Sequence, residues 1–595
     1  MSLHTITTIS INGLQITSFE QLQITQEIDG HHTFEILISQ DKLRSSGKTL
    51  FEQIKDLFGK EVRIEIKPEL PGSSATLLFR GIATNIVTGK SVNGIDGFCN
   101  IKGHSPTILL DDDPSIAVFE EKSLQAIAGE ILKKYPSNLL KSNNQPKHKD
   151  LLKYSVQYKE NSWHYLQRLA SSYGEWLFYD GSNLNFGEIK SGQVTLSHLK
   201  DLLSFDLEIG VKSSNINFHS YEYINDKPVK VDTKSQNSGT FNKLTDHVLK
   251  ISDSLYSNQA LYKVNQVITD QAQQELKQMA KLQRSSRIAQ MVFAKGVSTS
   301  LELKIGSVAE IKEDFRSTAE HGKYFITHLV HHCDGDGNYQ NFFTSIPSDT
   351  AVPSYHPEHI PHCEAQSAVV VENHDDKGLG RVKVKFHWQE KGTTPWIRIV
   401  SAAGGGDKGF YFIPEKGEEV WVDFEGGNPE LPFVVGTKYN GNAKSSFGNK
   451  DNDIKAIRTR SGHTIELIDK KGEEEVHIYD AEKSNVIILS SHDKTMKIVS
   501  KGDLSLQGKN VSITAEDKLS LESKNKEVSV KSSKALSLES VSDNITLKTS
   551  KKMMYEAMEL NIAAKQKIQV DGGMQATVKS MKTTVQGTTS KIEVM

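Results

Sequence analysis

The chain has 595 residues, a formal net charge of −3 and 24% charged residues, which predicts several domains and excludes an electrostatic bias toward nucleic acid or anionic membranes. No apolar run approaches the roughly 20 residues that a membrane-spanning helix needs, and Met1–Gln15 lacks the basic and apolar regions of a signal peptide. The three cysteines, Cys99, Cys333 and Cys363, suit a reducing cytoplasm and argue against a disulfide framework.

The first 110 residues alternate apolar and polar side chains in short runs, which predicts an all-β barrel or sandwich. The predicted strands are Leu14–Thr17, Thr33–Ile38, Val62–Ile66, Thr76–Phe79 and Ile82–Val87. Ser123 is a predicted N-cap for a helix Leu124–Lys134, which must end before Pro136. A second helix, Ser162–Tyr173, is expected to end at Gly174, the residue type that most easily adopts the left-handed C′ conformation.

The following segments return to β structure. Strands are predicted at Trp176–Tyr179 and Asn183–Phe186, and residues 205–350 are expected to be mostly β. Ser257–Ala280 interrupts them with a composition rich in Gln, Ala and Lys, which predicts a helix. Three prolines, Pro353, Pro357 and Pro361, lie in a His-rich stretch that we interpret as a linker over residues 351–366.

Residues 367–440 predict a compact unit of five strands separated by Gly and Pro turns. Arg381–Phe386, Trp396–Val400 and Glu419–Phe424 alternate strictly, so each is expected to have one core face and one solvent face. Five short strands with tight turns are typical of a small closed barrel such as the oligonucleotide/oligosaccharide-binding (OB) fold. Its tryptophans do not lie within a basic stripe, so we interpret them as core or trimer contacts, and we expect no nucleic-acid binding.

The end of the chain repeats apolar–polar–apolar triplets with a mean period of 8.0 residues, from Leu504/Leu506 to Ile592/Val594. Each triplet matches a short half-buried strand that is too small to bury a core alone. The polar remainder of each octad has the composition of a turn. Eight residues fit a single-chain β-helix poorly, but they suit a triangular prism in which three chains each lay one strand per face and leave no long free edge. The octads therefore predict a homotrimer.

Several segments resemble the VgrG family, the spike proteins of type VI secretion systems. In the predicted barrel they are Gly380–Trp388, Trp396–Arg398, Pro414–Pro429 and Pro432, and Ser461–Ile465 is similar to the segment that follows the barrel in the family. Upstream, the matching segments are Phe79–Gly81, Gly103–Pro106, Tyr158–Leu169 and Tyr173–Gly181, which resemble the family's hub domain. One departure is Asn428, because family members often carry Asp in this Gly–x–Pro turn.

The resemblance implies a mainly β fold in the order hub, OB barrel, neck and needle. We expect a phage-hub-like domain of β-barrels with a helical insert over residues 1–350, the linker 351–366, the OB-fold barrel 367–440, a neck 441–485 and a trimeric triangular β-prism 486–595. It also implies a structural, membrane-puncturing spike that is assembled in the cytoplasm and then injected through the contractile apparatus. The implied partners are two further copies, a PAAR-like tip protein, an Hcp-like inner tube, baseplate proteins, non-covalently carried effectors and the target membrane.

The best candidates for the tip contact are the last five residues, Lys591, Ile592, Glu593, Val594 and Met595, because a blunt prism end with unpaired edges needs a cap. The alternative reading is the spike of an extracellular injection system or a phage-like tail. A trimeric adhesin and a hydrolase-bearing spike fit less well. The hub motifs and the missing signal peptide oppose the adhesin, and residues 441–485 leave too little chain for a lysozyme insert.

We expect no catalytic, cofactor or metal site. Two groups have the composition of a metal site: His328, His331, His332 and Cys333, and then His356, His359, His362 and Cys363. Strand alternation would separate the first group onto two faces, and the second lies in the linker without zinc-finger spacing. The acidic runs Asp111–Asp113, Glu418–Glu419 and Glu473–Glu475 are interpreted as solvated loops or strand ends, and Asp334–Gly337 as a hairpin turn. No nucleophile elbow or phosphate-binding loop is present.

Overall fold

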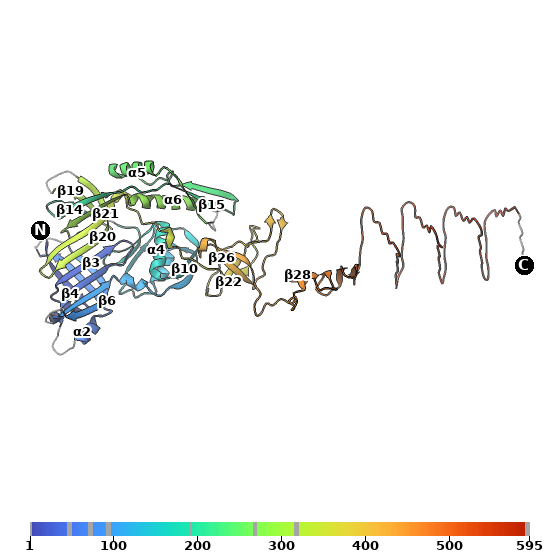
Figure 1. The fold of residues 1–595 in the computed structure, drawn as a ribbon, viewed down its shortest axis with the longest axis horizontal. Coiled ribbons are helices and arrows are strands. Elements are labelled where there is room, and N and C mark those ends of the chain that lie inside the picture. The colour runs from blue at the N-terminus through green and yellow to red at the C-terminus, as the bar shows by residue number, and fades with distance from the viewer. Residues whose placement is uncertain are drawn as a thin grey trace. The chain divides into compact units, whose positions relative to one another are not determined.

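A computed structural model describes residues 3–43, 50–69, 75–90, 97–190, 192–265, 271–314 and 320–588 of the chain. The fold is mainly β, as predicted, and it divides into two units, Met1–Lys455 and Ala456–Met595 (Figure 1). Among the helices within these ranges, none has both the length and the apolar character needed to cross a membrane.

The larger unit contains two β-barrels that share one long hairpin. Their strands are β1 Leu3–Ile11, β2 Leu14–Ile16, β3 Gln21–Glu27, β4 Thr33–Ser39, β5 Glu61–Pro68, β6 Leu77–Lys90, β7 Gly97–His104, β13 Gln193–Ser197, β14 Leu202–Ile209, β18 Val292–Ser298, β19 Val308–Lys312, β20 Glu320–Asp334 and β21 Asn338–Pro347. Strand β20 pairs with both β3 and β21, and the pairings from β3 through β4, β7, β6, β5 and β1 lead back to β21, which closes the first barrel. The other half of the hairpin pairs with β19 and β18, which lead to β13 and β14 in the second barrel. Each barrel encloses its own apolar core.

The strands of the first barrel follow the predicted alternation. In β4, for example, Phe34, Ile36 and Ile38 are buried and the residues between them are not. The two predicted strands at 76–79 and 82–87 are halves of the single strand β6. Gly81 between them is not a turn residue, because β6 continues through it. A Cβ at this position would lie 2.6 Å from the Phe34 ring of β4, so glycine allows the close packing of that ring.

A helical layer joins the two barrels to the rest of the unit. It comprises η1 Pro106–Leu110, α3 Leu124–Leu132 and α4 Ser162–Tyr173, with strands β8 Ser115–Ser123, β9 Ser142–Gln145, β10 Leu151–Glu160, β11 Trp176–Tyr179 and β12 Leu184–Gly187. The short helices α1 Gln40–Leu43 and α2 Leu50–Leu57 lie apart from this layer, against the first barrel. The predictions for α3 and α4 are confirmed. The Ser123 hydroxyl accepts the Ala126 amide at the start of α3, and Gly174 ends α4 at a φ of 69°. The strand predicted at Asn183–Phe186 forms as β12, one residue later.

The prediction of a helix over Ser257–Ala280 is wrong at its start and its end. The insert consists of β15 Ile216–Glu222, β16 Lys227–Asp232, α5 Lys243–Leu255, β17 Ala260–Lys263 and α6 Ala272–Ala289. Residues 260–263 form a strand because they pair in parallel with β15, which overrides their local preference. Helix α6 continues past the predicted end because Arg284 and Ile288 keep the buried stripe that Leu276 and Ala280 begin.

The barrel that follows is built on a four-stranded sheet in the order β23-β22-β26-β27. Its elements are β22 Gln366–Glu372, β23 Lys383–Phe386, β24 Gly404–Gly405, β25 Lys408–Gly409, β26 Glu419–Phe424, η4 Glu425–Gly427 and β27 Pro432–Thr437, preceded by η2 Ser348–Thr350 and η3 Pro357–His359. The predicted strand Trp396–Val400 does not form a ladder. Instead, Ile397 and Ile399 make isolated bridges to Val382 and Val434, so the alternation survives without a continuous strand.

An antiparallel meander of five strands follows, made of β28 Ile454–Arg458, β29 Thr464–Ile468, β30 Glu475–Tyr479, β31 Asn485–Ser490 and β32 Thr495–Ser500. The boundary between the two units falls within β28, and the rest of the meander belongs to the second unit. The predicted division between neck and needle, at residues 485 and 486, falls inside this sheet. The domain limits given above therefore stay predictions.

Candidate functional site

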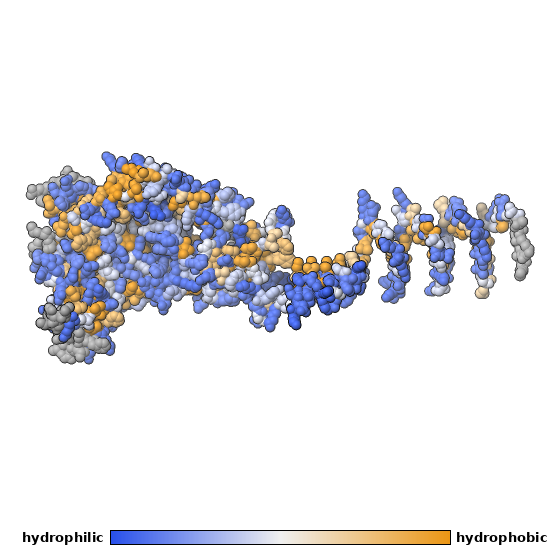
Figure 2. All heavy atoms as spheres, in the orientation of Figure 1, coloured by the Kyte–Doolittle hydropathy of each residue, from blue (hydrophilic) through white to orange (hydrophobic). Residues whose placement is uncertain are grey.

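The second unit carries apolar side chains that its own chain leaves uncovered. In the meander, Ile465 pairs with Ile478, which pairs with Ile487, which pairs with Ile498, so all four lie on one face. Ile465 and Ile478 are each 42% exposed and Ile498 is 49% exposed. Figure 2 shows apolar side chains gathered along one side of this sheet.

The octad tract continues this pattern without any partner strand. Over residues 501–588 the structure describes neither helix nor strand, although the chain runs in regular bends. Both members of the octad pairs are exposed, as in Leu504 at 57%, Leu506 at 72% and Leu521 at 74%. The tract therefore leaves its regularly spaced apolar side chains exposed to water. The candidate tip residues 591–595 lie outside the described residues.

The larger unit holds a buried ion-pair network where the hub meets the small barrel. Arg168 on α4 donates from Nε and Nη2 to the two Glu160 carboxylate oxygens at 3.0 and 2.9 Å, and from Nη2 to the Val156 carbonyl at 2.6 Å. Its Nη1 donates to Glu430 Oε1 in the barrel at 3.1 Å. Burial opposes the charge on Arg168, but Glu430 and Glu160 outweigh it and raise the pKa of the guanidinium. The Arg168 guanidinium therefore keeps its positive charge in this buried position.

Glu430 reaches this network because the barrel turn positions it. Asn428 Oδ1 accepts the Glu430 amide at 2.9 Å, and the Glu430 carboxylate also accepts the Ser155 hydroxyl and the Val156 amide of β10. Asn428 thus provides the acceptor that Asp would provide in the same turn. Figure 1 shows α4 and β10 beside β22 and β26 of the barrel. Tyr154 on β10 belongs to the barrel's apolar core.

A second polar group resembles a catalytic relay but is closed to substrates. Thr107 Oγ1 lies 2.7 Å from His31 Nδ1, and His31 Nε2 lies 3.3 Å from Asp111 Oδ2. Thr107 has no exposed surface, and the Trp163 ring covers His31 at a centroid distance of 4.3 Å. Asp111 also accepts the Asn161 side chain at the N-terminus of α4. We interpret the group as an anchor for that helix.

The first His/Cys group follows the predicted strand alternation. His331 and Cys333 are buried, whereas His328 and His332 lie on the other face of β20. Both ring nitrogens of His331 have hydrogen-bond partners: Nδ1 lies 2.7 Å from the Tyr339 hydroxyl, and Nε2 lies 3.0 Å from Gln26 Oε1. Burial lowers the pKa of His331 to about 3, so its imidazole is neutral. Of the four residues, only His331 and Cys333 are buried in the hub.

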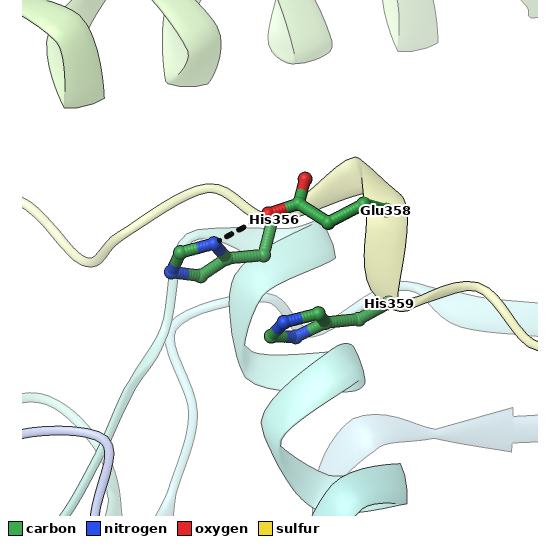
Figure 3. A group of neighbouring side chains, drawn as sticks. All are labelled: His356, Glu358 and His359. Atoms are coloured by element: carbon green, nitrogen blue, oxygen red, sulfur yellow. Dashed lines mark hydrogen bonds and ion pairs between the residues drawn. The ribbon is translucent and has the colours of Figure 1, made fainter.

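The second His/Cys group does not stay together. His356, the residue before η3, lies close to Glu358 and His359 of η3, and the ligand atoms of these three residues are within 4.8 Å of one another (Figure 3). His362 is exposed. Cys363 instead is buried in the barrel core, where its amide donates to the Gly427 carbonyl. Glu358 was not among the residues predicted from the sequence. Its position between two histidines, directly after a proline, is the signal that could have identified it.

Two small acidic and aromatic features are also structural. Asp334 Oδ1 accepts the amides of Asp336 and Asn338 in the tight turn of the β20–β21 hairpin, which confirms the predicted hairpin. Trp388 stacks on Phe386 at 5.3 Å and donates to Gln366 Oε1 at 2.6 Å. These contacts agree with the interpretation of this tryptophan as part of the barrel core.

Two family models match the chain. Residues 43–337 match the phage tail baseplate hub family, and residues 366–439 match the injector OB domain of type VI secretion systems and phage baseplates. Among solved structures, the lidded Francisella PdpA–VgrG complex has a TM-score of 0.55 and 11% identity, covering 84% of this chain and 80% of that one. The chain therefore has the fold of a phage-tail hub fused to an OB barrel.

Curated relatives give the closer assignment. The chain is 33% identical over 159 residues to the type VI secretion system spike protein VgrG1b of Pseudomonas aeruginosa, covering 22% of this chain and 21% of the relative. It is 34% identical over 133 residues to VgrG1a of the same organism, covering 19% of this chain and 20% of the relative. The matches thus span about a fifth of the length of these relatives. The chain belongs to the VgrG family.

Proposed function

We propose that this chain is the spike subunit of a type VI secretion machine and that it acts as a homotrimer. The observation that carries the proposal is the uncovered apolar side of the second unit, which runs from the meander through the octad tract. Three copies that lay these stripes against one another would remove them from water and pair the free backbone groups. A closed prism held by interchain hydrogen bonds along its length is stiff under axial load, and its function is shape and rigidity.

The partners follow from this role as further proposals. The two β-barrels of the hub would bind an Hcp-like tube and its baseplate. A PAAR-like protein would cap the end of the prism near residues 591–595. Effectors would travel bound non-covalently, and the trimer would be injected through the contractile apparatus into a target membrane. The hub and OB family matches support this arrangement, and a PdpA–VgrG complex among the solved relatives is consistent with bound partner proteins.

Light scattering on the purified protein tests the trimer. The expected mass is three times the 66.3 kDa of the chain. A variant ending at Ser500 keeps the meander intact and is expected to have a weaker trimer, because it loses every octad pair. A full-length chain that remains monomeric at micromolar concentration contradicts the proposal. In the producing cell, deletion of residues 501–588 should stop release of tube protein into the medium, while the chain itself still accumulates.

A further inference from the structure

One turn of helix between the hub and the barrel brings three metal-binding side chains together. His356 directly precedes the 3₁₀ turn η3, and His359 is the last residue of that turn. Side chains three positions apart lie above one another in such a turn, and the rings of His356 and His359 are at a centroid distance of 4.7 Å and an interplanar angle of 13°. Glu358 Oε1 lies 3.0 Å from His356 Nδ1. Figure 3 shows the carboxylate and both imidazoles on the same side of the segment.

The backbone that carries these side chains is fixed to two helices. The His356 amide donates to the Ser171 hydroxyl of α4 at 2.7 Å, and the Tyr355 amide donates to the Ser286 hydroxyl of α6 at 3.2 Å. Within the turn, the His359 amide donates to the His356 carbonyl at 3.1 Å, and the first residue of the turn is a proline, which restricts the backbone further. Side-chain rotation is therefore the main freedom left to the three groups.

The three side chains offer the kinds of atom that bind a cation. Two imidazole nitrogens and a carboxylate oxygen come from one short segment of the chain. Glu358 and His359 are exposed, so an ion can reach them from solvent.

We propose that His356, Glu358 and His359 bind one divalent transition metal ion of the Zn²⁺ class per chain. Two imidazoles and one carboxylate match the ligand preference of Zn²⁺, whereas Mg²⁺ and Ca²⁺ require six or more oxygen ligands. Zinc bonds of about 2.0–2.2 Å need the ligand atoms roughly 3.3 Å apart, which small side-chain rotations achieve from separations of at most 4.8 Å. The ion replaces the hydrogen bond between His356 and Glu358, and water completes its coordination.

The bound ion would stiffen the segment that connects the hub to the barrel. All three ligands come from one turn, so the bonds to the ion link its side chains and oppose unfolding of the turn. The connecting segment is held at His356, whose amide donates to the Ser171 hydroxyl of α4, and at Cys363, which is buried in the barrel core. Zinc should therefore protect residues 351–362 from proteolysis without changing the oligomeric state.

The test uses the tag-free, full-length protein after treatment with a chelator. It is titrated with ZnCl₂ against a fluorescent zinc indicator, and separately with CoCl₂ while the visible absorbance of tetrahedral cobalt is recorded. The wild type is expected to bind one ion per chain. His356→Ala and His359→Ala are expected to lose about tenfold or more in affinity, and Glu358→Gln about as much.

The matched control is His374→Ala. His374 is also an exposed histidine beside an acid, with its Nε2 3.6 Å from Asp376 and 91% of its side chain exposed, but it belongs to no three-residue group of this kind among the described residues. Its loss should leave zinc affinity unchanged. Circular dichroism checks that each variant is folded, as expected for solvent-facing side chains. Equal zinc binding by the wild type and the double variant His356→Ala/His359→Ala, whether strong or absent, refutes the proposal.

Discussion

Replacing Arg168 with methionine is expected to lower the free energy of unfolding by about 3–5 kcal/mol, because it leaves a buried carboxylate without its countercharge. The Arg168 side chain is only 4% exposed. Methionine keeps most of its apolar stem and removes the guanidinium. Glu160, with an 8% exposed side chain, would then retain only the Tyr158 amide at 3.4 Å as a hydrogen-bond donor. Glu430 is 25% exposed and keeps two other donors, so most of the loss arises at Glu160.

The measurement is urea unfolding followed by circular dichroism, with the chain concentration held constant because an oligomer's stability depends on it. Arg63→Met is the matched control, since its side chain is 67% exposed beside Glu61 and such surface pairs contribute about 0–1 kcal/mol. Adding Glu160→Gln to Arg168→Met should recover part of the loss by removing the orphaned charge. A cost for Arg168→Met no larger than that of the control, or no recovery in the double variant, would refute the reasoning.

Three further predictions test other parts of the chain. Burial lowers the pKa of His32 and of His331 to about 3, below their unfolded value of about 6.5. The contribution of these neutral histidines to the free energy of unfolding is therefore fully present above about pH 6.5. It falls with acidification, by about 2 kcal/mol per histidine at pH 5. The urea midpoint of His331→Gln should therefore change less between pH 7 and pH 5 than that of the wild type. Gly174→Ala should cost about 1–2 kcal/mol in urea unfolding, since φ is 69° and the new Cβ would lie 2.5 Å from Leu282. Gly192→Ala, with open space around it, should be nearly neutral. Leu521→Asp should weaken the trimer in light scattering, and Ser520→Asp on the opposite face should not.

Local signals in the sequence determine much of the helical layer. The limits of α4 follow from the N-cap Asn161, whose side chain accepts the His164 amide, and from Gly174 at the other end. The start of α3 follows from Ser123 in the same way. These groups act within four residues of one another, so a single sequence contains the whole interaction. The octad period is local too, and the exposed pairs agree with the inference that one chain cannot bury them.

Long-range pairing could not be predicted in this way. Strand β20 pairs with β3 about three hundred residues earlier in the chain, and no local pattern specifies that register. The strand β17 forms inside a helix-like composition because β15 offers it a free edge. Likewise, the contact between Arg168 and Glu430 spans 262 residues, and nothing near Arg168 in the sequence identifies its barrel partner.

Two of the segments that resemble VgrG proteins, Tyr158–Leu169 and Pro414–Pro429, contribute to the junction between hub and barrel. The hub segment provides Arg168 and Glu160, and the barrel turn provides Glu430, held in place by Asn428. If the chain transmits axial load as proposed, that load would pass from the barrel into the hub through β10. Its Tyr154, Val156 and Tyr158 pack in the barrel core, and its Leu152 packs in the hub core. A hydrogen-bonded charge network at this place resists sliding in more than one direction, because its geometry is fixed by bidentate contacts. Apolar packing alone has no such directionality. We therefore interpret the buried charges as fixing the orientation of the small barrel relative to the hub.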